Sequence, residues 1–142
     1  MSGVAVVWYL LTQHDPLTDV VPAVDIKAGT LPEKVKPPAI SISHISAVRR
    51  NTVSMGEATT LVTERVQATY HAHDSERGGT DYPGLSAGML LIRQACPNQR
   101  GTINGVSVTS ILPDIEGPDL EAPTEGIIAR SQDLIVRWHE QR

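Results

Sequence analysis

One long run of alternating residues constrains the fold of this chain more than any other feature: ATTLVTERVQATYHAH, at positions 58–73. Successive side chains of a β-strand point to opposite faces, so residues two apart share a face. Apolar or aromatic side chains share one face of this run, namely Val62, Val66, Ala68, Tyr70 and Ala72. Polar side chains share the other face, namely Thr63, Arg65, Gln67, Thr69, His71 and His73. The pattern predicts a long strand with one apolar face and one polar face.

Two helices are predicted from apolar residues that recur with a period close to 3.6. The first spans 3–14, with apolar positions at Val4, Val7, Trp8 and Leu11. It ends at HDP (14–16), because the residue before a proline avoids the α region. Three apolar residues then indicate one further turn, namely Leu17, Val20 and Val21. The second helix ends before Pro97 and contains Leu85, Met89, Ile92 and Cys96 at i, i+4, i+7 and i+11.

Four further strands are expected, at 23–29, 39–48, 103–112 and 126–140. Within 39–48 the apolar positions shift after His44, which predicts a bulge or a twist. The order of elements is helix, three strands, helix, two strands. The predicted fold class is therefore α+β, with a largely antiparallel mixed sheet of about five strands and two helices packed on one face.

The length of 142 residues suits a single domain, here 1–142, with one core. Val4–Leu11, the longest apolar run near the start, is too short to span a bilayer. It has no basic segment before it and no cleavage site after it, so a chain that stays in the compartment of its synthesis is expected. Cys96 is the only cysteine, which excludes intrachain disulfides and thiolate metal cages and favours simple packing.

The charge distribution argues against nucleic acid as the main ligand. The formal net charge is −4, and the whole negative excess lies in 72–142, which contains ten acidic and six basic residues. Strong non-specific binding to nucleic acid needs many contacts between Lys or Arg and phosphate. The chain also has no Phe and only five Trp and Tyr residues, so a base-stacking platform is not expected.

The run TYHAHD (69–74) raises the possibility of metal chemistry, because His71 and His73 are two residues apart. The familiar hydrolase run is His-x-His-x-Asp-His, whereas here Asp74 follows directly and no terminal histidine is present. A zinc site needs a third protein ligand and a second shell. A solvated strand end is therefore the favoured interpretation, and no metal, cofactor or catalytic residue is expected. A small metal-dependent hydrolase using His71 and His73 is kept as the less favoured alternative.

The segment PDIEGPDLEAPTE (113–125) has five acidic residues, no basic ones and three prolines. It is interpreted as a solvated loop or, alternatively, as a stiff arm whose apolar residues dock on a neighbour. A 13-residue connection without structure of its own is long for a compact domain and often functional. The candidate interface residues in this segment are Asp114, Ile115, Glu116, Asp119, Leu120 and Glu121.

Charged residues on two of the predicted strands complete the candidate interface. Arg49 and Arg50 end one strand, and Glu64 with Arg65 interrupts the next. On a monomer these residues are expected to form a solvated face. In a ring of identical subunits, opposite charges on complementary edges would fix the register between neighbours.

Three stretches resemble one known family, the tail-terminator or tail-completion proteins of long-tailed phages and gene-transfer particles. VVWYLLTQHDPLTDVVP (6–22) is similar to the family's opening helix with its aspartate-containing turn. TLPEKVKPPAISISHIS (30–46) is similar to its Leu-Pro loop and Pro-x-Ile strand. ERVQATYHAHD (64–74) is similar to its Arg-Val-Gln strand. The late helix and the two closing strands correspond in order, so the resemblance covers nearly the whole chain.

The resemblance implies a non-enzymatic virion protein at the tail-neck junction, assembled in the host cytoplasm. It implies a homohexameric ring that caps the finished tail tube and offers a surface to the head connector. The partners would be copies of itself, the major tail tube protein and the head-connector or stopper protein, with no membrane involved. DNA would only pass through the lumen. A head-completion or stopper protein of the neck is the alternative within the same class.

Overall fold

The computed structural model describes residues 2–31, 36–50, 53, 56, 58–73, 82–122 and 126–141. Its helical elements are α1 (Gly3–Gln13), α2 (Asp15–Thr18), the 3-10 turn η1 (Ala23–Asp25) and α3 (Tyr82–Ala95). Its strands are β1 (Ile26–Ala28), β2 (Ala39–Arg50), β3 (Thr59–His73), β4 (Gly101–Ile103), β5 (Val106–Glu116), β6 (Leu120–Ala122) and β7 (Ile127–Gln141). None of the helices in these ranges is long and apolar enough to cross a membrane.

The strands form one sheet in the order β1-β2-β3-β7-β5-β4, and β6 pairs with β7. Every pairing is antiparallel except that of β1 with β2. The predicted α+β class and the largely antiparallel sheet are confirmed. The long central pair β3 and β7 is in register from Thr59 opposite Gln141 to His73 opposite Ile127.

The sheet has more strands than the sequence predicted, and two local causes explain the difference. The expected strand 103–112 is a hairpin, because Asn104 and Gly105 both have positive φ, at 49° and 78°. Positive φ at both central residues belongs to the two-residue turns that fit the twist of paired strands. The second cause is β6, which lies in the segment expected to be a loop.

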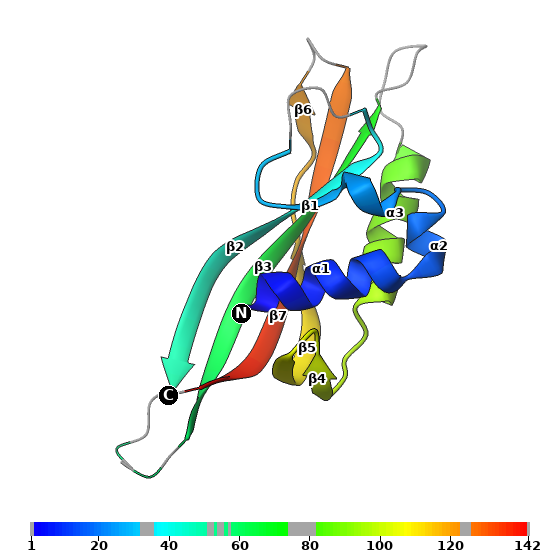
Figure 1. Ribbon diagram of the computed structural model, residues 1–142. Coiled ribbons are helices and arrows are strands. Elements are labelled where there is room, and N and C mark those ends of the chain that lie inside the picture. The colour runs from blue at the N-terminus through cyan, green and yellow to red at the C-terminus, as the bar shows by residue number, and fades with distance from the viewer. Residues whose placement is uncertain are drawn as a thin grey trace.

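All three α-helices lie on one face of the sheet, and β2, β3 and β7 extend past them (Figure 1). Helix α1 packs on β1, β2 and β3, and α3 packs on β3 and β7. In α1 the buried apolar residues are Val6, Val7 and Leu11, so the stripe lies slightly away from the predicted one. Trp8, expected in that stripe, is part-exposed, and its Nε1 donates to the carbonyl oxygen of Ile26 at 3.1 Å.

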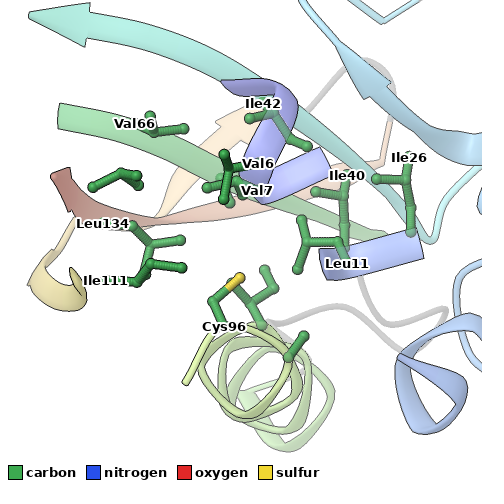
Figure 2. Close-up of a cluster of buried hydrophobic side chains, with 14 of the residues drawn as sticks. Val6, Val7, Leu11, Ile26, Ile40, Ile42, Val66, Cys96, Ile111 and Leu134 are labelled. Carbon is green, nitrogen blue, oxygen red and sulfur yellow. The ribbon is translucent and has the colours of Figure 1, made fainter. Parts of the chain in front are cut away.

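The core lies between these helices and the apolar face of the sheet (Figure 2). Figure 2 shows side chains of α1 meeting Ile40 and Ile42 of β2 and Val66 of β3. Cys96 at the end of α3 lies in the same cluster, as the sequence predicted. Burial raises the pKa of its thiol to about 12, so this cysteine is not a reactive nucleophile at neutral pH.

The two predicted faces of β3 are confirmed by burial. Val62, Val66, Ala68, Tyr70 and Ala72 are all buried, whereas the alternate residues from Leu61 to His71 are half-buried. The bulge expected after His44 is also confirmed, because the register of β2 against β3 shifts between His44 and Ser46. Beyond this shift β2 leaves the core, and its last residues are mostly exposed.

Helix α3 approaches the sheet most closely at Gly88. A Cβ atom built on Gly88 would lie 2.7 Å from Cε2 and Cζ of Tyr70, whose ring is buried. Gly88 is therefore required by packing and not by backbone conformation, because it lies inside a regular helix.

Gly88→Ala is expected to destabilise the protein although alanine favours helix formation. The gain in helix propensity is about 1 kcal/mol, and overpacking against Tyr70 costs about 1–3 kcal/mol. The free energy of unfolding from urea titration should fall for Gly88→Ala. Ser86→Ala, at an exposed position of the same helix, should change it by less than about 0.5 kcal/mol. A more stable Gly88→Ala variant would contradict the close packing.

Candidate functional site

His71 lies on the polar face of β3, where its Nε2 is 3.2 Å from Oγ of Ser41 on β2. A shallow hollow of about 400 Å³ opens beside this pair, lined by Gly29, Thr30, Leu31, Ser41, Ser43 and His71. Among the described residues of that lining, His71 carries the only ionisable side chain. Within the residues that the structure describes, no group of three His, Cys, Asp or Glu residues could hold a metal ion. The side chain of His73 and the whole of Asp74 lie outside those residues.

Burial lowers the pKa of His71 below its ordinary value of 6.5. The unfolded chain therefore binds a proton at a higher pH than the native chain does, so stability should fall as the pH falls below about 6.5. Urea midpoints of the wild type and His71→Asn, measured between about pH 7.5 and 5, should show a smaller loss for the variant. Identical losses in the two proteins would mean that His71 stays as easily protonated in the native state as in the unfolded one.

Arg65 joins β3 to β5 and β7 on the polar face of the sheet. Its Nη1 is 2.6 Å from Oδ2 of Asp114 and 3.0 Å from Oδ2 of Asp133. Gln67 donates from Nε2 to the other oxygen of Asp133 at 3.1 Å. The hydrogen bond with Asp114 and, to a smaller extent, the hydrogen bond with Asp133 raise the pKa of Arg65. The two carboxylates thus share one guanidinium within a single chain.

Two further arginines hold the rest of the acidic segment. Arg93 of α3 donates from Nη1 to Glu116 at 2.8 Å. Arg130 of β7 donates from Nε to Asp119 at 2.7 Å, and its Nη1 is 3.9 Å from Glu116. The hydrogen bond from Arg130 lowers the pKa of Asp119. The guanidinium also lies 5.8 Å from the ring centroid of Tyr82, within the range of a cation–π contact.

These contacts correct the prediction that 113–125 is a loop or a free arm. Residues 113–116 continue β5, and 120–122 form β6 on β7. Residues 123–125 and the side chain of Glu121 lie outside the described part of the chain. The carboxylates of Asp114, Glu116 and Asp119 are bound by arginines of their own chain, while Ile115 and Leu120 remain exposed. Within the described part of the segment, Ile115 and Leu120 are therefore the exposed large apolar side chains.

The turn between β5 and β6 is fixed to β7 at Gly117. Its N–H donates to the carbonyl oxygen of Ser131 at 2.8 Å, and a Cβ on Gly117 would lie 2.6 Å from Oγ of Ser131. A side chain at position 117 therefore requires the hydroxyl of Ser131 or the turn itself to move.

Gly117→Ala is expected to displace this turn and to destabilise the protein by about 1–3 kcal/mol. The double variant Gly117→Ala with Ser131→Ala should recover most of the loss, because Cβ of Ser131 is 3.9 Å from the added atom. Thermal unfolding of the wild type, both single variants and the double variant gives the coupling energy. Additive effects of the two substitutions would show that this contact does not hold the segment.

At the opposite edge of the sheet, the end of β2 carries apolar and basic side chains. Ile45 and Val48 are exposed. Arg49 donates from Nε to Oε2 of Glu140 at 2.7 Å. Arg50 is exposed, and no ion pair of it occurs within the described residues. The structure therefore places Arg49 and Arg50 far across the sheet from the acidic segment, with β3 and β7 between them.

Glu64 corrects another prediction, because its side chain is only 2% exposed and does not belong to a solvated face. Its Oε1 accepts hydrogen bonds from the N–H of Gly3 at 2.8 Å and from Nε1 of Trp138 at 3.0 Å. Its Oε2 is 2.9 Å from Nδ1 of His44. A carboxylate at the first turn of α1 satisfies a free helix N–H and lies at the positive end of the helix dipole. Glu64 is thus structural.

The sequence reasoning missed three residues around the acidic segment. Arg93 and Arg130 bind its carboxylates, and Asp133 shares Arg65 with Asp114. It also missed the exposure of Ile45 and Val48, because the alternating pattern of 39–48 predicts that the apolar residues of this strand are buried. For Arg130 one signal was present, since an arginine directly after the apolar residues Ile127, Ile128 and Ala129 favours an acidic partner.

Comparison with known proteins gives one informative result. No protein-family model and no curated protein matches the chain. Among solved structures, the chain is similar to a chain from a structure described as the virion of a native gene transfer agent particle. The TM-score is 0.67 at 8% identity, and the match covers 98% of this chain and 96% of the other. At this identity the likeness establishes a shared fold over essentially the full length of both chains.

Proposed function

We propose that this chain is a structural protein of a phage-type virion, forming a ring that terminates the tail tube and joins the tail to the head connector. The observation that carries the proposal is the full-length similarity of fold to a chain of a gene transfer agent virion. The position within the virion rests on the sequence resemblance to tail-terminator proteins.

A ring of identical subunits needs two different surfaces on each subunit, which meet and close through rotation. The candidates for these surfaces are the two opposite edges of the sheet, one with acidic and apolar residues and the other with basic and apolar residues. The net charge of −4 also suits a ring around DNA, because an acidic protein does not hold the phosphate backbone in place. The partners of this ring would be the major tail tube protein below it and the head connector above it.

Particle production without this protein tests the proposal. Tails should be over-long or unable to join heads, and expression of the wild-type chain from a plasmid should restore normal particles. Normal tails joined to heads in the absence of the protein would contradict the proposal. Gold labelling of an added peptide tag separates this role from that of a stopper protein, since the label should lie at the tail-tube end and not at the portal end.

A further inference from the structure

We propose that the exposed edge of β2 in one copy contacts the exposed edge of β5 and β6 in the next copy, so that the sheets of neighbouring subunits adjoin. The inference rests on the proposed ring and names the two surfaces that would close it. The two edges lie at opposite sides of the same sheet, with β3 and β7 between them (Figure 1).

The first surface is the edge of β2 beyond its short pairing with β1. Strand β1 covers only Ile40–Ile42, and no other described strand lies outside β2. Residues 43–50 therefore expose a row of backbone groups that can accept a neighbour. Ile45 is also exposed, Val48 is 64% exposed, and Arg50 follows at the end of the strand.

The second surface is the edge formed by β5 and β6. Strand β4 covers only Val106–Val108, and no other described strand lies outside the remainder of β5 or outside β6. Leu112 and Leu120 are exposed, and Ile115 is 61% exposed. Exposed apolar side chains that cluster on one edge indicate a contact with another protein surface.

The direction of the strands permits the two edges to lie side by side. Strands β2 and β7 run in one direction, while β3, β5 and β6 run in the other. In a ring whose rotation preserves strand direction, β2 of one copy would be antiparallel to β5 of its neighbour. Antiparallel is also the pairing that dominates within the sheet itself.

The residues of the second edge favour contact through side chains over a continuous backbone ladder. Pro113 and Pro118 lie along it, and proline on an edge strand removes a donor and prevents unlimited pairing. Apolar side chains would therefore supply most of the contact, with Ile115 and Leu120 meeting Ile45 and Val48.

Charge complementarity favours a second copy as the occupant. Among the described side chains around the second edge, the four carboxylates of Asp114, Glu116, Asp119 and Asp133 and three arginines leave one negative charge. At the first edge Arg49 is paired with Glu140, and Arg50, which has no ion pair within the described residues, contributes a positive charge. Because the two surfaces differ, their contact is head-to-tail, and each copy has one surface for each of its two neighbours.

A cross-linking experiment on the full-length chain tests this inference. Val48→Cys and Ile115→Cys proteins are purified separately and treated with a short bismaleimide, alone and as an equal mixture. Cys96 is retained in every protein because it is buried. Light scattering on the untreated wild type measures ring formation independently. The matched control mixes Val48→Cys with Leu90→Cys, since Leu90 is 48% exposed on α3 and belongs to neither edge strand.

The mixture of Val48→Cys and Ile115→Cys should give cross-linked dimers at least tenfold above either protein alone and above the Leu90→Cys mixture. A double variant with both Val48→Cys and Ile115→Cys should give a series of cross-linked oligomers up to the full ring. If the wild type forms rings and these cross-links do not exceed the control, the proposed edges are wrong while the ring stands. Cross-linking of Val48→Cys to itself would show a symmetric contact and would also overturn the inference. A wild type that never assembles would contradict both this inference and the proposed ring.

Discussion

Replacement of Glu64 by alanine is expected to lower the free energy of unfolding by about 2–6 kcal/mol, because two buried hydrogen-bond donors lose their acceptor. The variant leaves the N–H of Gly3 and Nε1 of Trp138 buried without an acceptor. Each unsatisfied donor costs about 1–3 kcal/mol. Because whole domains are stable by only about 5–15 kcal/mol, this loss should clearly lower the urea midpoint of unfolding at neutral pH.

Two further variants identify the cause of that loss. Glu64→Gln retains an Oε1 acceptor for Gly3 and Trp138 and should recover part of the stability. Glu140→Ala removes an exposed carboxylate that pairs with Arg49, and surface pairs of this kind contribute less than about 1 kcal/mol. If Glu64→Ala were as stable as Glu140→Ala, the buried contact between α1, β3 and β7 would not hold the fold together.

Ile115→Asp is expected to dissociate the ring while leaving the monomer folded. Burial of an isoleucine side chain contributes about 1.5–3 kcal/mol, so its loss should weaken each subunit contact by about 10- to 150-fold. The new carboxylate would add to the negative charge of the β5–β6 edge. Every contact of a closed ring carries the same substitution, so size-exclusion chromatography with light scattering should show monomers at concentrations where the wild type is assembled.

The control for Ile115→Asp is Leu90→Asp, because Leu90 is an exposed apolar residue of α3 that belongs to neither edge strand. Both variants should unfold at nearly the same urea concentration as the wild type, and only Ile115→Asp should lose assembly. An Ile115→Asp protein with the wild-type mass in solution would remove the β5–β6 edge from the interface.

The long strand signals predicted most of the fold correctly. The alternation in 58–73 gave both faces of β3, and the shift after His44 gave the bulge of β2. The same alternation indicates that Glu64 is buried, since Glu64 lies between Val62 and Val66 on the apolar face. The opposite expectation came from the rule that charged residues are exposed. That rule fails here because hydrogen-bond donors from α1 and β7 converge on the carboxylate.

The acidic segment could not be predicted locally. Its prolines and carboxylates are typical of a loop, yet Arg65, Arg93 and Arg130, from three different elements, pair with three of its carboxylates. Strand preference depends strongly on such tertiary neighbours. The exposure of the apolar residues at the two sheet edges depends likewise on which strands lie beside them. The order and register of the strands cannot be deduced from any one strand alone.

The mass of the wild-type protein in solution, measured by native mass spectrometry across a range of concentrations, shows whether the chain closes into a ring. Closure into a ring of six copies of 15.3 kDa should give one discrete species of about 92 kDa that does not grow further at higher concentration. A monomer of 15.3 kDa at every concentration, or a series of masses without an end, would contradict the account.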